Sequence, residues 1–418
     1  DATYNETNLD FGGKKIYLKG VDHNTTGAQP VIDCQSSGRA FYFHSGETED
    51  SVVDNFTIKN GSADDGGVIY CDSSSPSIID CVFSGNGASN NGGVIWCGNS
   101  SSPSIINCTF SSNIASVDGG VVYCNNSSPV LTNCAFDGNT ADSGGAICCS
   151  NSSGPVLTNC VFNANIASSD GGAILCSNSS SPSATNCLFI SNNAGNKGGA
   201  IYCNSSTLTL TNCTFNSNVA IFFGGAINCD ASSNSTLNNC ILWGDSALLG
   251  GNEVYSDMWC TVTLNHCCVD NSASAYGGGG TIDDSNNCIH DDPRFIDVVN
   301  FNCHLKPSSP CIDKGNNTYI SGVGRDLDGD KRIVDGDGDG TGTVDIGAYE
   351  FNDIVYVDDV SGDDADDGLS WVTAKKTIQA GIDAASDWWL VLVADATYNE
   401  TNLNFSGKKI YLKGVDHN

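Results

Sequence analysis

Cysteine is the residue type whose number and spacing offer the clearest chemistry in this chain, which has 22 cysteines and one methionine among 418 residues. Seven successive segments each contain two cysteines, 10 or 11 residues apart, which form two columns along the chain. The first column is Cys71, Cys97, Cys124, Cys149, Cys176, Cys203 and Cys229, and the second is Cys81, Cys108, Cys134, Cys160, Cys187, Cys213 and Cys240. This one-to-one count predicts a disulfide within each segment, with Cys303 and Cys311 as a separate pair, if the Cα atoms lie within about 7 Å. The alternative is two ladders of buried free thiols, which behave as small hydrophobic side chains.

An acidic loop near the C-terminal end is the candidate metal site. Its carboxylates alternate along the chain and precede or follow Gly340: Asp335, Asp337, Asp339 and Asp345. Alternate carboxylates with a glycine at the sixth position let oxygens converge on a hard cation, so we predict calcium as the cofactor. The twelfth position holds Ile346 where an EF-hand has glutamate. A solvated acidic turn is the alternative.

Asn-Ser-Ser triplets mark candidate glycosylation sites at Asn99, Asn126, Asn151, Asn178 and Asn204. Their spacing predicts one asparagine at the same corner of five successive segments. A ladder of ordinary turns is the alternative, because asparagine and serine favour turns. The sequons and the high cysteine content of a polar chain favour an extracellular or cell-surface location.

The net charge of −31 argues against nucleic acid or an anionic membrane as a partner. We also predict no membrane insertion, since no run approaches 18 apolar residues. The chain opens without a signal sequence, and we expect a mature or internal piece.

The elements that position these residues come from a repeat of 25–27 residues, marked by Gly pairs at 66, 92, 119, 144, 171, 198, 224 and 250. Apolar residues alternate within each unit, so Ile69 and Cys71 share one face of a strand, opposite Tyr70. We predict two or three short strands per unit, which wind and stack into a parallel β-helix. The step from Phe to Asn three residues later, as in Phe110 and Asn113, predicts Phe inside and Asn at a corner, with hydrogen-bonded Asn side chains along the rod.

The combination of "GGAI" and "FxxN" resembles the repeats of polymorphic outer-membrane proteins and related bacterial surface β-helices, over roughly residues 60–260. The resemblance implies an all-β, right-handed parallel β-helix. The ending "DIGAYEF" is similar to the C-terminal end of secreted bacterial β-helix proteins, in which an anchoring segment follows. We expect no anchoring segment at this point of the chain, which departs from that pattern. β-Helices also carry polysaccharide lyases and hydrolases, yet Lys197 is the only basic residue between 62 and 260.

Residues 1–24 recur as residues 395–418 with changes only at Asp10/Asn404 and Gly12/Ser406. We therefore predict a body and end region over 1–350, with clear coils over 62–260 and an acidic end over 290–350. A cap over 351–394, with a short helix over 373–385, follows, and 395–418 begins the next tandem unit. The alternative is one domain whose terminal segment repeats for a local purpose.

These features predict a structural extracellular fibre or surface stalk of tandem 394-residue units, whose partners are copies of itself, end to end or bundled. The second interpretation is a surface adhesin that binds glycans or host protein through Tyr70, Trp96, Tyr123 and Tyr202. A polysaccharide-active enzyme is the third, because its chemistry needs a basic residue or paired carboxylates in a groove.

Overall fold

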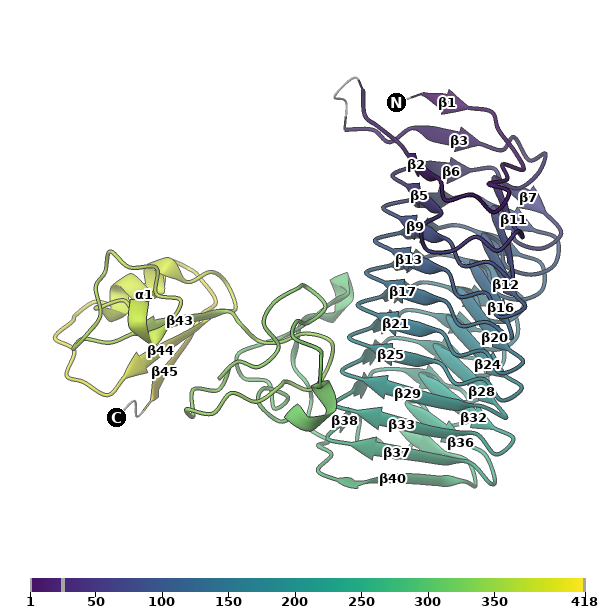
Figure 1. Cartoon of the computed structure of the whole chain (residues 1–418). Coiled ribbons are helices and arrows are strands. Elements are labelled where there is room, and N and C mark those ends of the chain that lie inside the picture. The colour runs from purple at the N-terminus through teal and green to yellow at the C-terminus, as the bar shows by residue number, and fades with distance from the viewer. Residues whose placement is uncertain (1, 24–26, 416–418) are drawn as a thin grey trace. The chain divides into compact units, whose positions relative to one another are not determined.

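The computed structural model describes residues 2–23 and 27–415, which form two compact units, Asp1–His290 and Asp291–Asn418. Unit 1 is built from short strands that stack in parallel, as Figure 1 shows for the strands from β1 to β40. No helix within the described residues has the length and hydropathy needed to cross a membrane.

Four parallel sheets make up unit 1 in the part of the chain that the structure describes. Sheet 1 contains β4 (Phe41–Phe43), β8 (Ile69–Asp72), β12 (Ile95–Gly98), β16 (Val122–Asn125), β20 (Ile147–Ser150), β24 (Ile174–Ser177), β28 (Ile201–Asn204), β32 (Ile227–Asp230), β36 (Val254–Ser256) and β39 (Tyr276–Gly277). Sheet 2 contains β2 (Tyr17–Lys19), β5 (Val52–Asp54), β9 (Ser77–Ile79), β13 (Ser104–Ile106), β17 (Val130–Thr132), β21 (Val156–Thr158), β25 (Ser183–Thr185), β29 (Thr207–Thr211), β33 (Asn234–Asn238), β37 (Thr261–Asn265) and β40 (Thr281–Asn286).

The other two sheets complete each coil. Sheet 3 contains β1 (Thr3–Tyr4), β3 (Val31–Asp33), β6 (Thr57–Lys59), β10 (Val82–Ser84), β14 (Thr109–Ser111), β18 (Ala135–Asp137), β22 (Val161–Asn163), β26 (Leu188–Ile190), β30 (Thr214–Asn216), β34 (Ile241–Trp243) and β38 (Cys268–Val269). Sheet 4 contains the two-residue strands β7 (Ser62–Ala63), β11 (Gly87–Ala88), β15 (Ile114–Ala115), β19 (Thr140–Ala141), β23 (Ile166–Ala167), β27 (Asn193–Ala194), β31 (Val219–Ala220) and β35 (Ser246–Ala247).

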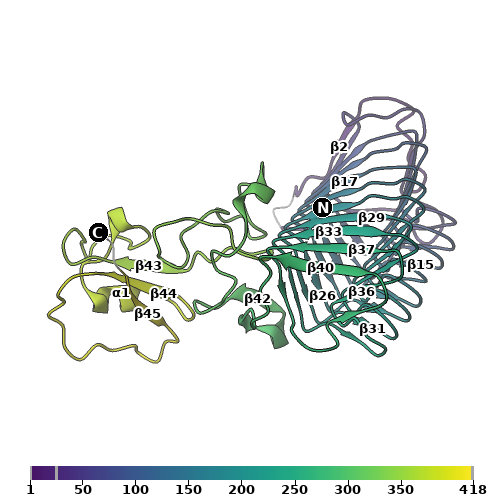
Figure 2. The same cartoon turned by 90° about the horizontal axis from the view of Figure 1, so that it is seen from below.

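The predicted fold, an all-β parallel β-helix, is confirmed, but a regular coil has four strands rather than two or three. Successive strands of each sheet pair in register, so that Ile95 lies between Ile69 and Val122. Sheet 4 escaped prediction because a strand of two residues is too short to show an alternating pattern. Figure 2 shows unit 1 from the β40 end, where the strands of successive coils can be followed.

The Gly pair marks the corner where the chain enters sheet 1. Gly119 has φ +66°, a left-handed conformation that glycine adopts without a steric cost. A Cβ atom on its neighbour Gly120 would lie 2.1 Å from the carbonyl oxygen of Gly145 in the next coil. The first glycine is therefore required for the turn and the second for the close approach of the coils.

Two predicted columns run through the interior. The Phe rings stack face to face, with 4.6 Å between the centroids of Phe136 and Phe162, and the Phe side chains from 83 to 215 are fully buried. The buried Asn column is hydrogen-bonded along the axis: Asn113 Nδ2 donates to Asn139 Oδ1 at 3.0 Å, and the pattern continues to Asn218. Both expectations, Phe inside and a ladder of Asn, are confirmed.

The Asn column ends at a carboxylate. Asn218 Nδ2 donates to Asp245 Oδ1 at 2.8 Å, and the backbone N–H of Asp245 donates to Glu253 Oε1 at 3.3 Å. Burial raises the pKa of Asp245 to about 7, and burial together with the charge of Asp245 raises the pKa of Glu253. This end of the column therefore holds a buried acidic pair.

Unit 2 contains the acidic end region together with the cap. It contains an antiparallel pair, β41 (Phe295–Asp297) and β42 (Asn302–Leu305), and a parallel sheet in the order β43 (Ile354–Val357), β44 (Leu390–Ala394) and β45 (Tyr411–Val415). Its helices are α1 (Ile378–Ala384) and the 3₁₀ turns η1 (Val298–Asn300), η2 (Asn317–Ile320) and η3 (Trp371–Thr373). The helix predicted over 373–385 thus begins later, at Ile378, where the side chain of Thr377 accepts a hydrogen bond from the N–H of Ala380.

Replacing Asp245 with asparagine should extend the amide column and flatten the dependence of stability on pH. Because the folded-state pKa is raised, the stability contribution of Asp245 is full below about pH 4 and is lost as the pH rises through about 7. Asp245→Asn should therefore stabilise the protein at pH 8, by at most about 4 kcal/mol, and change little near pH 4. Thermal unfolding midpoints at both pH values test this.

Asp137→Asn is the matched control, since Asp137 is exposed at the end of β18 and its replacement removes the same charge. An equal gain in both variants at pH 8 would contradict the role assigned to the buried carboxylate.

Candidate functional site

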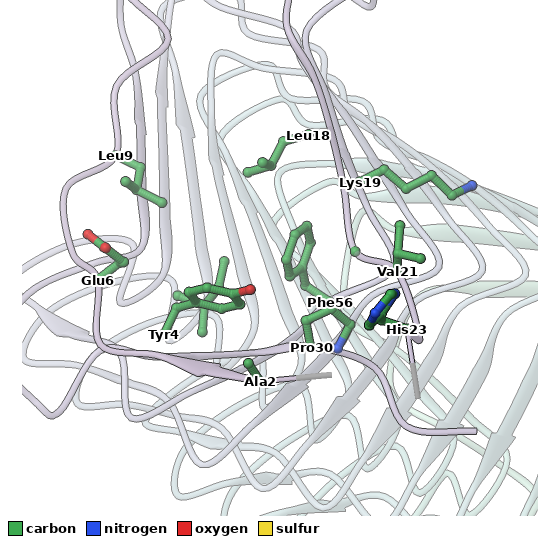
Figure 3. A pocket seen from close by; sticks show the side chains of 12 residues that line it. Ala2, Tyr4, Glu6, Leu9, Leu18, Lys19, Val21, His23, Pro30 and Phe56 are labelled. Carbon is green, nitrogen blue, oxygen red and sulfur yellow. The ribbon is translucent and has the colours of Figure 1, made fainter. Parts of the chain in front are cut away.

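The first coil leaves the interior of unit 1 open at its N-terminal end. A cavity of about 790 Å³ lies there, shown in Figure 3. Apolar residues line much of it: Leu9, Leu18, Pro30, Ile32 and Phe56. Tyr4, Glu6, Lys19 and His23 add polar groups to the lining. The cavity exists because, in the part of the chain that the structure describes, no coil covers the first one.

The strand at this end is an edge strand. β2 pairs on one side with β5, with Leu18 in register with Val53, and it ends its sheet in the described part of the chain. The side chain of Tyr17 is 60% exposed. An edge strand beside an apolar cavity is a template for another strand, and natural proteins usually cover or blunt such an edge.

The cap of unit 2 carries a compact core of its own. Val355 and Val357 on β43 and Val391 and Val393 on β44 are buried together. Helix α1 lies on this sheet through Gly381, because a Cβ atom there would meet Val357 at 2.5 Å and Val391 at 3.0 Å. The cap is therefore a short parallel sheet with one helix packed closely on it.

The duplicated segment 395–418 is seated on this cap. Its strand β45 pairs in parallel with β44, with Leu390 opposite Tyr411 and Val391 opposite Leu412. The N–H of Tyr411 donates to the carbonyl of Trp389 at 2.9 Å, and the N–H of Trp388 donates to the carbonyl of Lys409 at 2.6 Å. The second copy of the opening sequence therefore continues the sheet of the cap.

Two charged side chains of the same segment hold the ends of α1. The Glu400 carboxylate accepts from the N–H groups of Ile378 and Gln379 at 2.7 and 2.9 Å, at the N-terminus of the helix. The Lys408 ammonium donates to the carbonyls of Ile382, Asp383 and Ala385 at 2.8–3.0 Å, at the C-terminus. Each charge complements the helix dipole and satisfies terminal backbone groups. We call this pair the helix clamp.

Further contacts join the segment to the cap. The Tyr398 hydroxyl donates to the carbonyls of Val357 and Ala394 at 3.3 and 3.2 Å. The side-chain amide of Gln379 donates to the carbonyl of Asn404 at 3.1 Å and accepts from the N–H of Asn404 at 2.8 Å. Sequence reasoning detected the duplication but not the clamp, because nothing in the spacing of Glu400 and Lys408 identifies a helix that lies upstream.

The acidic loop forms part of a cluster that differs from the prediction. Carboxylate oxygens of Asp313, Asp335 and Asp337 lie within 4.8 Å of one another and could hold a cation. Asp313 was missed because it lies upstream of the loop and only the fold brings it there. Burial and the charges of Asp337 and Asp335 raise the pKa of Asp313 to about 6. A cation would offset the repulsion among these carboxylates.

Two of the predicted calcium ligands lie outside this cluster. Asp345 is fully buried and accepts from the N–H groups of Asp313 and Phe351, both at 2.7 Å, so its carboxylate braces the backbone. Asp339 is exposed and accepts from the N–H of Thr341 at 2.8 Å. The loop pattern therefore identified Asp335 and Asp337 as neighbours, and its other two members serve local structure.

The structure gives the cysteines as thiols, and every one except the half-buried Cys288 is buried. This arrangement has the alternative form, two thiol ladders. The in-segment disulfides and the Cys303–Cys311 pair stay predictions. The members of the first column lie on sheet 1, where Cys97 is in register with Cys71 and Cys124. Those of the second lie before sheet 3, where the N–H of Cys213 donates to Cys240 Sγ at 3.5 Å. Members of a column therefore have their counterparts in adjacent coils as cysteine neighbours.

The predicted glycosylation sites lie at corners between sheets 1 and 2. Asn99, Asn126, Asn151 and Asn178 are exposed and have φ near +54°, the left-handed region in which asparagine is common. Asn204 breaks the predicted alignment, because it is in register with Ser177 and Ser205 takes the left-handed corner. The turn ladder is thus present, and attachment of glycans stays a prediction.

Comparison with known proteins agrees with the fold. The model of a family described as "Right handed beta helix region" matches residues 7–162 and 43–195. Among solved structures, the crystal structure of pectate lyase Pel9A is similar at 14% identity, covering 84% of this chain and 86% of that chain, with a TM-score of 0.41. No curated protein matches the chain. Unit 1 is a right-handed parallel β-helix, and the finer resemblance to polymorphic outer-membrane repeats stays a prediction.

Calcium should bind to the cluster of Asp313, Asp335 and Asp337 and stabilise unit 2. Binding to the folded state alone gives about 2.7 kcal/mol at a calcium concentration 100 times Kd. Titration calorimetry with calcium chloride should show one site that Asp313→Asn removes. Asp339→Asn, in the same loop, is the control. Heat of binding that is unchanged by Asp313→Asn and lost with Asp339→Asn would contradict the assignment.

The thiol ladders predict a simple mass spectrum. Alkylation of the native protein by iodoacetamide should be slow because thiol reactivity requires exposure and the thiolate form. After unfolding without reductant, all 22 cysteines should be modified. Incomplete alkylation that reductant restores would instead show that disulfides form.

Proposed function

We propose that this chain is a rod-forming unit of an extracellular structural fibre or surface stalk, in which 394-residue β-helix units follow one another end to end. The observation that carries the proposal is the seating of residues 395–415 on the cap through β45 and the helix clamp. This segment repeats the sequence of the first coil, so the chain holds a β-helix and a cap joined to the opening strand of another. The partners are then copies of the same unit, with bundling as a further contact.

Charge and location fit this role. The net charge of −31 keeps neighbouring rods soluble and disfavours nucleic acid and anionic membranes as partners. Burial of the thiols protects them from oxidants, so an extracellular location does not depend on disulfides. Calcium would act at the junction, because Lys413 of the duplicated segment donates to the carbonyl of Asp337.

A polysaccharide-active enzyme has less support. Lys197, the one basic residue of the regular coils, donates to Asp230, which also accepts from the Tyr202 hydroxyl. Burial lowers the pKa of Lys197, but the hydrogen bond and charge of Asp230 raise it by more. A lysine held protonated in this way is a poor general base at neutral pH.

An adhesin is the second candidate, favoured by an aromatic stack on the outer side of sheet 1. The rings of Tyr70 and Trp96 stack with 4.3 Å between centroids and are half-buried, and Arg39 lies over the Tyr70 ring. Flat aromatic surfaces with a polar edge suit glycan or protein binding. Tyr202, also predicted to contribute, is buried and bonded to Asp230.

Electron microscopy of native material should show a thin filament with an axial repeat of roughly 50–70 Å. The lower figure is about 11 strands, the number in sheet 2, at ~4.8 Å, and the upper one is about 15 coils for the 394-residue period. Discrete particles of one unit's length, in a sample whose mass corresponds to the complete polypeptide, would contradict the fibre.

A further inference from the structure

From the two copies of the duplicated sequence, we infer that residues 2–23 form a docking surface for the cap of a second copy, a segment equivalent to residues 351–394. The inference rests on the proposed function and specifies its junction. The occupant is that cap because residues 395–415, which differ from the first copy only at Asn404 and Ser406, already bind one in this chain.

Equivalent side chains of the two copies differ in which of them are buried and which are exposed. In the first copy Phe11 is 6% exposed against the coils below, whereas Phe405 in the second is 36% exposed. Conversely, Tyr4 is 50% exposed beside the cavity, and its counterpart Tyr398 is half-buried against the cap. Each copy therefore buries the side that the other leaves open. Joining both environments on one segment would cover both sides.

The backbone of β2 can pair on both edges at once. The N–H of Gly20 donates to the carbonyl of Asp54 at 2.8 Å, toward β5. Successive N–H groups of a strand point to opposite edges, so the N–H of Tyr17 points away from β5. Its counterpart, Tyr411, donates to Trp389. Docking would therefore extend sheet 2 in the order β43, β44, β2 and β5.

The same register closes the open interior. Leu18 is in register with Val53, and Leu412, the counterpart of Leu18, is in register with Val391. A docked cap would place its Val391 above Leu18 and so add one residue to an interior column. Helix α1 packs on Val391, so it would cover the cavity lined by Leu18, Ile32 and Phe56.

The helix clamp has both of its charges in the first copy. Glu6 and Lys14 correspond to Glu400 and Lys408, and both are exposed at the uncovered end of unit 1. In the seated copy these side chains bind opposite ends of α1, so they fix the direction of the helix as well as its position. A cap placed in reverse would put each charge at the unfavourable end of the helix dipole.

The test extends the full chain at its N-terminus by a second copy of residues 351–394 and compares hydrogen exchange with that of the unextended chain. Peptides within residues 2–23 should exchange at least about tenfold more slowly in the extended chain, because β2 gains a partner strand. The double variant Glu6→Gln with Lys14→Gln should lose most of this protection. Both side chains are exposed in the first coil, so unit 1 should fold normally without their charges.

Asp10→Asn is the matched control and should retain the protection. The seated copy has Asn404 at this position, and its backbone N–H and carbonyl make the hydrogen bonds to the cap. Equal exchange in the extended and unextended chains would overturn the docking surface even if native filaments are seen. Protection that survives loss of both charges would overturn the proposed seating. Protection in a protein that forms no filaments would support the docking and count against the fibre.

Discussion

A single coil of this protein cannot satisfy its own backbone. Its strands are parallel, so their N–H and C=O groups point along the axis, and each finds its partner only in the coil before or after. The interior has the same property, since the ring of Phe136 is covered by Phe110 on one side and Phe162 on the other. Stability is therefore shared between neighbours, as in other solenoids, and the difficult positions are the two ends.

This constraint explains why interior residues repeat by type. The register places Cys97 between Cys71 and Cys124, so residues of the same type lie next to one another in successive coils. Each interior side chain must therefore pack well against copies of its own type. Phe, Asn and Cys do so in different ways: rings by planar stacking, amides by a donor and an acceptor on each residue, and thiols as small apolar groups. Asp245 ends the amide column because a carboxylate can accept but, when ionised, cannot donate further.

The same constraint makes the two ends of the β-helix the places where a further segment is needed. An edge strand beside an open apolar cavity tends to pair with a strand of another molecule unless a further segment covers it. Unit 2 contains a suitable cover, a parallel sheet with a helix whose two ends are held by Glu400 and Lys408 of the repeated sequence. In the proposed fibre, the complementarity of clamp and helix dipole would give the junction a direction, which an end-to-end polymer needs and an aggregate lacks.

The repeat period, the buried Phe and Asn columns and the duplicated segment could all be read from the amino-acid sequence, because a solenoid maps nearest neighbours in space onto a constant spacing in the chain. The two-residue strands of sheet 4 could not, since two residues define no period. Nor could the choice between disulfides and thiol ladders, because the count of cysteines per coil suits both and only register shows that Cys71 faces Cys97. Asp313 in the acidic cluster and the clamp on α1 depend on segments that the fold brings together across irregular loops. The coil and its repetition are local and periodic, so they follow from the amino-acid order alone. The contacts at the corners and within the cap depend on the folded chain, because no period relates the residues that meet there.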